Sequence, residues 1–137
     1  MLTDGQGVPI GVAVAGANVH DQKLVEETLV GIPVRRPRPT TDAAQHLCAD
    51  KGYDAEAVRR VAKRRRYIAH IPKKGDDSPP AKHRGGKARR WVVERTHSWT
   101  NRARRLLVRW EKKAINYLAF LHLQFAITTL RAAAVLG

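Results

Sequence analysis

The chain alternates short apolar runs with longer helical patterns, and this alternation limits the folds that it can adopt. Residues 8–15, VPIGVAVA, place apolar side chains at every second position, which is typical of a β-strand. Two shorter apolar runs, at 46–49 and 67–71, also predict strands. Amphipathic patterns over 22–31 and 55–66 predict helices between them. This order of elements indicates an α/β sheet.

Turn and cap residues separate these elements. Asp4 and Gly5 predict a hairpin turn just ahead of the first strand. We expect Asp21 to cap the first helix and Asp54 to cap the second. Residues 33–39, PVRRPRP, predict an extended basic loop.

The last third of the chain predicts two helices, over about 88–110 and 113–135. The apolar face of the first is formed by Val92, Thr96, Trp99, Ala103, Leu106 and Trp110. Its polar face carries Arg90, Glu94, His97, Asn101 and Arg105. The second helix is apolar but includes Asn116, His122 and Gln124, so we expect it to be a buried helix rather than a membrane span.

The chain is strongly basic, with 26 lysines and arginines, 12 acids and a net charge of +14. The excess is uneven: residues 1–34 hold one lysine and four acids, whereas residues 35–113 hold 24 basic and eight acidic residues. Such a charge predicts a polyanionic partner, nucleic acid before an acidic membrane surface. The apolar fraction of 43% is enough for a core, which argues against a disordered basic tail.

Redox and targeting signals point to the cytosol. Cys48 is the single cysteine, which excludes an intrachain disulfide and a cysteine-based zinc site. The first residues have neither the basic region nor the long apolar stretch of a signal peptide. We therefore expect a protein of a reducing cytoplasm.

Asp50 stands where the predicted strand at 46–49 ends. In open α/β sheets, ligands bind where the carboxyl ends of the strands meet the following loops. Gly52 lets the backbone turn closely at this point. The alternative is that Asp50 only stabilises the turn or caps the next helix, a role already given to Asp54.

Glu94 is the only acid between Asp77 and Glu111, and it lies among many cations. The alternative for an isolated glutamate is a solvated ion pair with Arg90, one helical turn earlier. Together, however, Asp50 and Glu94 provide the carboxylates that a hard cation such as Mg²⁺ prefers alongside substrate phosphates. Such a pair is typical of metal-dependent phosphoryl transfer, in which two metal ions assist the attacking and leaving oxygens.

Three segments, "LCADKGYD", "YIAHIPKKG" and "RRWVVERTHSWTNRARRLLVRWEKK", resemble the C-terminal half of bacterial insertion-sequence transposases of the DDE, ribonuclease H-like class. The resemblance implies that residues 1–137 are the C-terminal portion of a DDE catalytic domain, an α/β, partial ribonuclease H-like fold with long C-terminal helices, in which 75–86 form a flexible loop. It implies that Asp50 and Glu94 match the second and third catalytic acids and hold Mg²⁺ or Mn²⁺. The implied activity is cleavage and strand transfer of transposon DNA.

The resemblance also implies DNA contacts. A signature of related groups places Tyr, Arg, Glu and Lys at fixed spacing; Arg90 and Glu94 match it, whereas Lys87 and Asn101 depart from it. The adjacent Arg102 could serve in place of Asn101. The residues expected to bind DNA are Lys51, Lys73, Lys74, Arg90, Arg95 and Arg102. The implied partners are double-stranded transposon ends and target DNA, and a second copy in a homo-oligomer; the implied location is the bacterial cytoplasm at the nucleoid, without a membrane partner.

One catalytic element of the family is not found in this sequence. Its first catalytic Asp lies on a strand ahead of the hairpin, and neither Asp4 nor Asp21 is a credible substitute. Without that strand, we expect the strand at 8–15 to have no neighbour and the strand at 46–49 to have one open edge. We therefore expect a fragment that is inactive alone. It is either the product of a truncated gene or the downstream product of a transposase split over two reading frames, and in the second case its partner is the upstream half of the same transposase.

Two other functions are compatible with these residues. A non-catalytic basic DNA-binding protein would bind DNA through its positive charge alone, and its carboxylates would have a structural role. A nuclease on the same fold would cut nucleic acid without joining ends.

Overall fold

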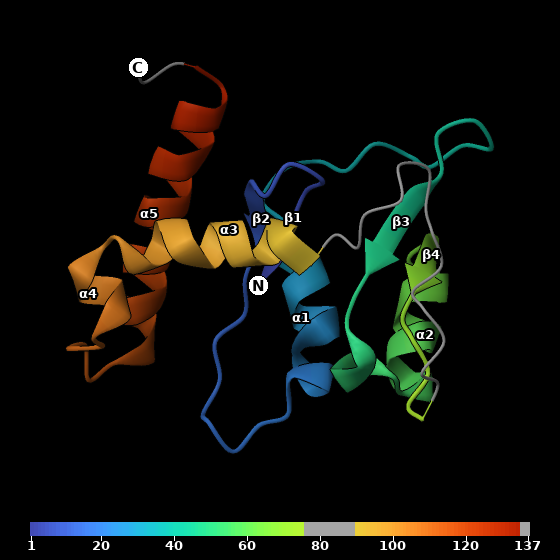
Figure 1. Ribbon diagram of the computed structural model, residues 1–137, viewed down its shortest axis with the longest axis horizontal. Helices are drawn as coiled ribbons and strands as arrows, with labels where there is room; N and C mark the ends of the chain where they lie inside the picture. The colour runs from blue at the N-terminus through green and yellow to red at the C-terminus, as the bar shows by residue number, and fades with distance from the viewer. Residues whose placement is uncertain (76–89, 135–137) are drawn as a thin grey trace.

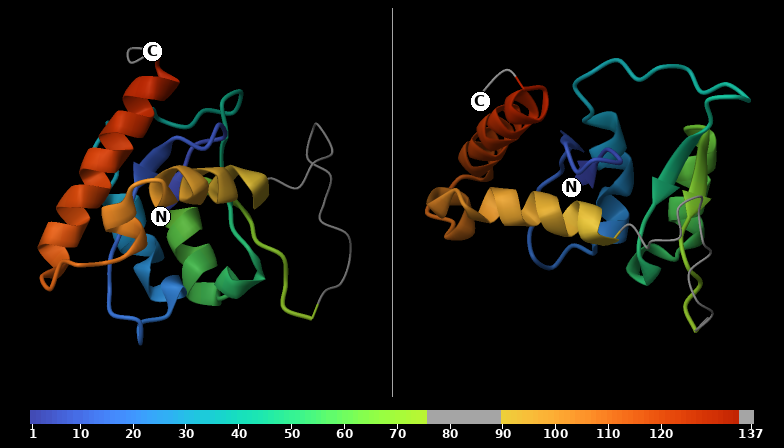
Figure 2. Two further views of the ribbon diagram at one scale, coloured as in Figure 1. Left: turned by 60° about the vertical axis from the view of Figure 1, so that its left-hand side comes forward. Right: turned by 45° about the horizontal axis from the view of Figure 1, so that its top comes forward.

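A computed structural model of the chain describes residues 1–75 and 90–134 and shows a mixed α/β fold with two small sheets and a long C-terminal helix. Figure 1 shows the parallel sheet and its helix at one end, three helices at the other, and the N-terminal hairpin between them. The right view of Figure 2 shows the same order from a further direction, and the left view shows α5 beside α3. The predicted α/β class is confirmed at this level, whereas the expected flexible loop at 75–86 lies almost wholly outside the described residues.

The N-terminal hairpin pairs β1 (Leu2–Thr3) with β2 (Pro9–Gly11) in antiparallel fashion. The side chain of Asp4 closes the turn, because its Oδ1 accepts the backbone N–H groups of Gln6 (2.8 Å) and Val8 (2.9 Å). The expectation that the strand at 8–15 has no neighbour is therefore wrong. The strand is also shorter than predicted, since pairing stops where the two residues of β1 end.

Both predicted helix caps are wrong. The first helical segment is a 3₁₀ helix, η1 (Asp21–Leu24), that continues as α1 (Val25–Val30). Asp21 lies inside its first turn, where His20 is the cap residue and makes no side-chain capping bond. The cap residue of α2 (Glu56–Arg64) is Ala55, because the carboxylate of Asp54 is bonded elsewhere.

The second sheet pairs β3 (Gln45–Cys48) with β4 (Tyr67–His70) in parallel, with Gln45 opposite Tyr67 and Cys48 opposite His70. Helix α2 is the crossover between them. A core of Leu29, Leu47 and Ala62 joins α1, β3 and α2. Within the described residues β3 pairs only with β4, as expected for a strand with one open edge.

The single helix predicted over 88–110 is broken into α3 (Arg90–Asn101) and α4 (Arg104–Leu107). The break falls at Ala103, whose backbone is extended and which precedes α4. This bend lets Leu106 pack against Leu121 and Phe125 in a second core. Trp110, which the apolar pattern predicted to be buried, is 74% exposed because the chain has left the helix before reaching it.

The C-terminal helix α5 (Ala114–Ala132) confirms the second predicted helix. It buries one face, through Leu121, Phe125 and Thr128, while Ile115 and Leu123 are exposed. The expected buried helix is thus buried on one side only. In the part of the chain that the structure describes, no helix has the length and apolar character needed to cross a membrane.

Helix α3 is fixed to the hairpin by a close contact at Gly7. The buried hydroxyl of Thr96 donates to the carbonyl of Gly7 at 2.5 Å. Gly7 has a φ of +88°, and a Cβ there would lie 3.1 Å from the carbonyl oxygen of Val92. Only glycine permits both this backbone conformation and this approach.

We predict that Thr96→Val lowers the free energy of unfolding by about 1–3 kcal/mol, because it leaves a buried carbonyl without its donor. Thr100→Val is the matched control: its hydroxyl contacts the Thr96 carbonyl at 2.9 Å within the same helix, so we expect a loss below about 1 kcal/mol. Urea unfolding of both variants measures the difference, and equal losses would contradict the assigned role of the Gly7 contact.

Candidate active site

Asp50 lies just beyond the carboxyl end of β3 and begins a second 3₁₀ helix, η2 (Lys51–Tyr53). Its Oδ1 accepts the backbone N–H of Gly52 at 2.7 Å, and the residue is exposed. A Cβ on Gly52 would lie 2.8 Å from that oxygen, so a larger residue would displace the carboxylate. Asp50 therefore does stabilise its turn, as the alternative interpretation expected. This role uses only one of its two carboxylate oxygens.

The 3₁₀ helix η1 supports the end of the sheet at which Asp50 lies. The side-chain amide of Gln22 donates to the carbonyl of Gly52. The pKa of the half-buried Tyr53 phenol is raised, first by burial and then by the negative charges of Asp21 and Asp50. The helix η1 therefore contacts this end of the sheet from a distant part of the chain, which no local sequence signal indicates.

Asp54 fixes the segment that follows β4. Its Oδ1 accepts from Arg59 Nη2 at 2.6 Å, and its Oδ2 accepts the backbone N–H of Lys74 at 2.7 Å. Arg59 also donates to the carbonyl of Ile71 at 2.8 Å. Asp54 thus ties the start of α2 to residues 71–74, a positioning role that the expectation of a helix cap missed. The spacing of Asp54 and Arg59, just over one helical turn, is the signal that could have indicated it.

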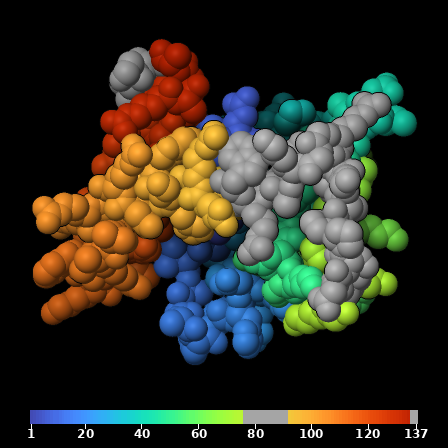
Figure 3. Space-filling model, in the orientation of Figure 1, coloured from blue at the N-terminus to red at the C-terminus, as the bar shows by residue number. Residues whose placement is uncertain are grey.

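Glu94 is exposed on the polar face of α3, together with His97, as the helical pattern predicted. It is the fifth residue of α3, and the N-terminal end of this helix is directed towards the β3–β4 sheet in Figure 1. On the face shown in Figure 3, α3 and α4 form one side of the surface, and η1 with α1 lies below them. The side chain of Arg90 lies outside the described residues, so the alternative ion pair with Glu94 remains untested.

The predicted DNA-binding cations fall into two groups. Lys51, Lys73 and Lys74 are exposed at the carboxyl edge of the parallel sheet, where Asp50 also lies. Arg95 and Arg102 are exposed on α3 and at the break that follows it. The guanidinium of Arg95 lies over the ring of Trp99, 5.8 Å from its centroid, so this tryptophan contacts a cation rather than lying wholly in the core.

The carboxylates come from separate elements. Among residues 1–75 and 90–134, no group of three His, Cys, Asp or Glu side chains lies close enough to hold a metal ion. Asp50 and Glu94 would therefore need a further ligand from outside this set, or from substrate, to complete such a site.

Comparison with known proteins identifies the family. The family described as transposase DDE domain matches residues 47–131, a range that includes both Asp50 and Glu94. The chain belongs to this family. It is also 36% identical over 133 residues, 90% of its length, to a protein of Burkholderia cepacia assigned as the transposase for insertion sequence element IS402. The match spans 57% of that relative. No solved structure matches the chain.

We predict that Asp54→Asn changes how the stability of this DDE transposase chain depends on pH. The pKa of Asp54 is lowered, chiefly by the hydrogen bond from Arg59 and then by the N–H of Lys74. The ionised carboxylate therefore stabilises the fold above its unfolded pKa of about 4, and this stabilisation is lost as the pH falls through the lower folded pKa.

Thermal unfolding followed between neutral and acidic pH tests this expectation. The Asn variant should unfold at a lower temperature than the original chain near neutral pH, and the two should converge in acid. Asp42→Asn, at an exposed position in the loop before β3, is the control and should follow the original chain throughout. A constant difference between the Asp54 variant and the original chain at every pH would contradict the assignment.

Proposed function

We propose that this chain supplies two carboxylates, Asp50 and Glu94, to the active site of a DDE transposase that cleaves transposon ends and transfers them to target DNA. The observation that carries the proposal is the placement of Asp50. It follows a strand of a parallel pair, at the edge where Lys51, Lys73 and Lys74 are also exposed. The family match across Asp50 and Glu94 supports the same assignment.

The proposed architecture is the C-terminal part of a ribonuclease H-like catalytic domain. The match to only 57% of the relative supports the view that residues 1–137 form part of that domain, and that a further acid comes from outside them. Among the described residues β3 has a neighbour on one side only, which supports this as well, because a central strand of such a sheet would have neighbours on both sides. The complete protein would act as a homo-oligomer in the bacterial cytoplasm, at the nucleoid.

Asp50 and Glu94 would hold Mg²⁺ or Mn²⁺, for which carboxylate oxygens are suitable ligands. The donor set agrees with this choice, since Oδ1 of Asp50 is oriented by Gly52 while Oδ2 takes no part in that turn. A bound metal ion would supply charge stabilisation for the attacking and leaving oxygens of a phosphodiester. The chain itself would orient DNA through the cations at the two ends of this site: Lys51, Lys73, Lys74, Arg90, Arg95 and Arg102.

A second candidate is a non-catalytic DNA-binding protein, favoured by the use of the Asp50 carboxylate within its own turn. The two candidates differ in their response to metal. A purely electrostatic binder would show a steep salt dependence that Mg²⁺ alters only as a competing cation.

We predict that Asp50→Asn and Glu94→Gln each lower metal-dependent cleavage by at least about a thousandfold in the complete transposase. Losing a metal ligand removes several kcal/mol of transition-state stabilisation, and each 1.36 kcal/mol corresponds to about a tenfold change in rate. DNA binding should not weaken, because neither variant removes a cation that contacts phosphate.

Cleavage of a labelled transposon-end duplex in Mg²⁺ measures the effect, and Asp42→Asn serves as a control that removes an exposed acid elsewhere. Normal cleavage by either site variant would refute the assignment. Joining of the cut ends to a second duplex would separate a transposase from a nuclease.

A further inference from the structure

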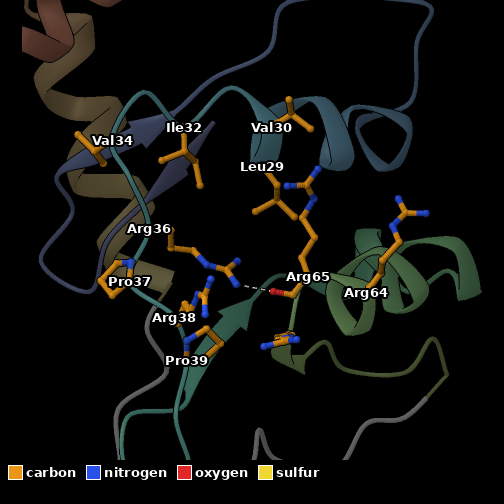
Figure 4. A pocket seen from close by; sticks show the side chains of 11 residues that line it. Leu29, Val30, Ile32, Val34, Arg36, Pro37, Arg38, Pro39, Arg64 and Arg65 are labelled. Atoms are coloured by element: carbon orange, nitrogen blue, oxygen red, sulfur yellow. Dashed lines mark hydrogen bonds between the residues drawn. The ribbon is translucent and has the colours of Figure 1, made fainter.

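A basic cavity of about 610 Å³ lies between the extended segment 33–39 and the end of α2. Figure 4 shows Arg36 and Arg38 reaching into it from one side and Arg65 from the other, below an apolar wall that includes Leu29 and Ile32. Among the residues that the structure describes, five arginines line it and no acid does: Arg36, Arg38, Arg64, Arg65 and Arg66.

The charges in this cavity are poorly neutralised by the chain itself. Within the described residues, only Arg64 of the five forms an ion pair, with Glu26. The Nε of Arg65 is buried and has no hydrogen-bond partner in the described part of the chain. Arg36 donates to the carbonyl of Arg65 at 2.5 Å and also lies over the ring of Tyr67, which brings the two arginine-bearing segments together. Concentrated positive charge of this kind creates a potential that attracts anions.

The cavity and Asp50 lie at opposite ends of strands β3 and β4. Arg66 immediately precedes β4, and the side chain of Gln45, at the start of β3, donates to the carbonyl of Pro37 at 3.0 Å. Because β3 and β4 are parallel, the cavity is at their amino ends, whereas Asp50 and Lys73 are at their carboxyl ends. The cavity is therefore separate from the candidate active site.

The backbone conformation of Arg66 supports a role for this arginine in binding rather than in stabilising its turn. Its φ is +58°, in the left-handed region where glycine is favoured after a helix. An arginine at this position stabilises the turn less well than glycine would. Cations in the last turn of a helix favour its dipole, which accounts for Arg64 and Arg65. It does not account for Arg36 and Arg38, which arrive from a segment about thirty residues earlier in the sequence.

We propose that this cavity is a second DNA contact, which binds the phosphodiester backbone of the duplex away from the carboxylates. The ligand has repeated charges, because Arg36 and Arg38 are two residues apart on an extended segment and so lie roughly 6–7 Å apart along it. The apolar wall suits the sugar faces between phosphates. The inference rests on the proposed function in one respect, that the partner is DNA.

The experiment compares three variants of the chain that each remove one positive charge: Arg38→Gln, Arg66→Gly and the control Arg60→Gln. Arg60 is exposed on α2 but does not line the cavity. Binding of a fluorescein-labelled DNA duplex is measured by anisotropy over a series of salt concentrations. Each cavity variant should lower the slope of log affinity against log salt by about 0.9, which corresponds to about an eightfold loss of affinity at about 0.1 M salt. The control should change affinity by less than about twofold.

Arg66→Gly separates binding from folding. Glycine accepts the left-handed conformation, so this variant should unfold at the same or a higher temperature while binding DNA more weakly. A purely structural role for Arg66 would not produce this combination. If the control loses as much affinity as the cavity variants, net charge alone explains binding and the proposal is overturned.

Two further outcomes would also overturn the proposal. The first is that the original chain binds no duplex at any salt concentration. The second is that polyglutamate binds as tightly as DNA of equal charge and depends equally on Arg38 and Arg66, because the cavity would then serve an acidic protein. None of these results bears on Asp50 and Glu94, whose role is decided by the cleavage assay.

Discussion

The contact between Thr96 and Gly7 fixes helix α3 to the N-terminal hairpin. The hydroxyl of Thr96 binds the Gly7 carbonyl inside a turn that only glycine can form at that distance from α3. The hairpin that contains this turn packs on both cores, through Leu2 against the α1–β3–α2 core and through Val12 against the α4–α5 core. Because α3 carries Glu94 and the first core supports β3, the relative placement of the two candidate carboxylates depends on this hairpin.

The spacing of apolar residues predicted a helix or strand correctly where contacts local to that element determine its structure. The strand that became β3, the helix α5 and the polar face holding Glu94 all follow from the spacing of apolar residues. The predictions were wrong where a contact with a residue distant in the sequence determines the local structure. Ala103 interrupts a continuous helical pattern because Leu106 packs on α5, and Asp54 leaves the cap position because it binds Arg59 and the backbone of Lys74.

The candidate site was predictable only in part, for the same reason. The place of Asp50 after a strand follows from the sequence, as does the need for Gly52 beside it. The contact of Gln22 with Gly52 at the same end of the sheet, and that of Arg36 with Arg65, join segments about thirty residues apart. No periodicity within either segment indicates such a contact, so these groups become visible only in the fold.

The parallel arrangement of β3 and β4 gives a defined separation between the two proposed DNA contacts, one at each end of the strands. Four strand residues at roughly 3.3 Å each place the arginine cavity about 13 Å from the start of the Asp50 turn. A duplex rises about 3.4 Å per base pair, so this distance corresponds to about four base pairs. One continuous DNA segment is therefore long enough to contact the arginines at one edge and the lysines beside Asp50 at the other. Phosphate contacts at both edges would set the position of the duplex along the sheet, and with it the phosphodiester that faces the carboxylates.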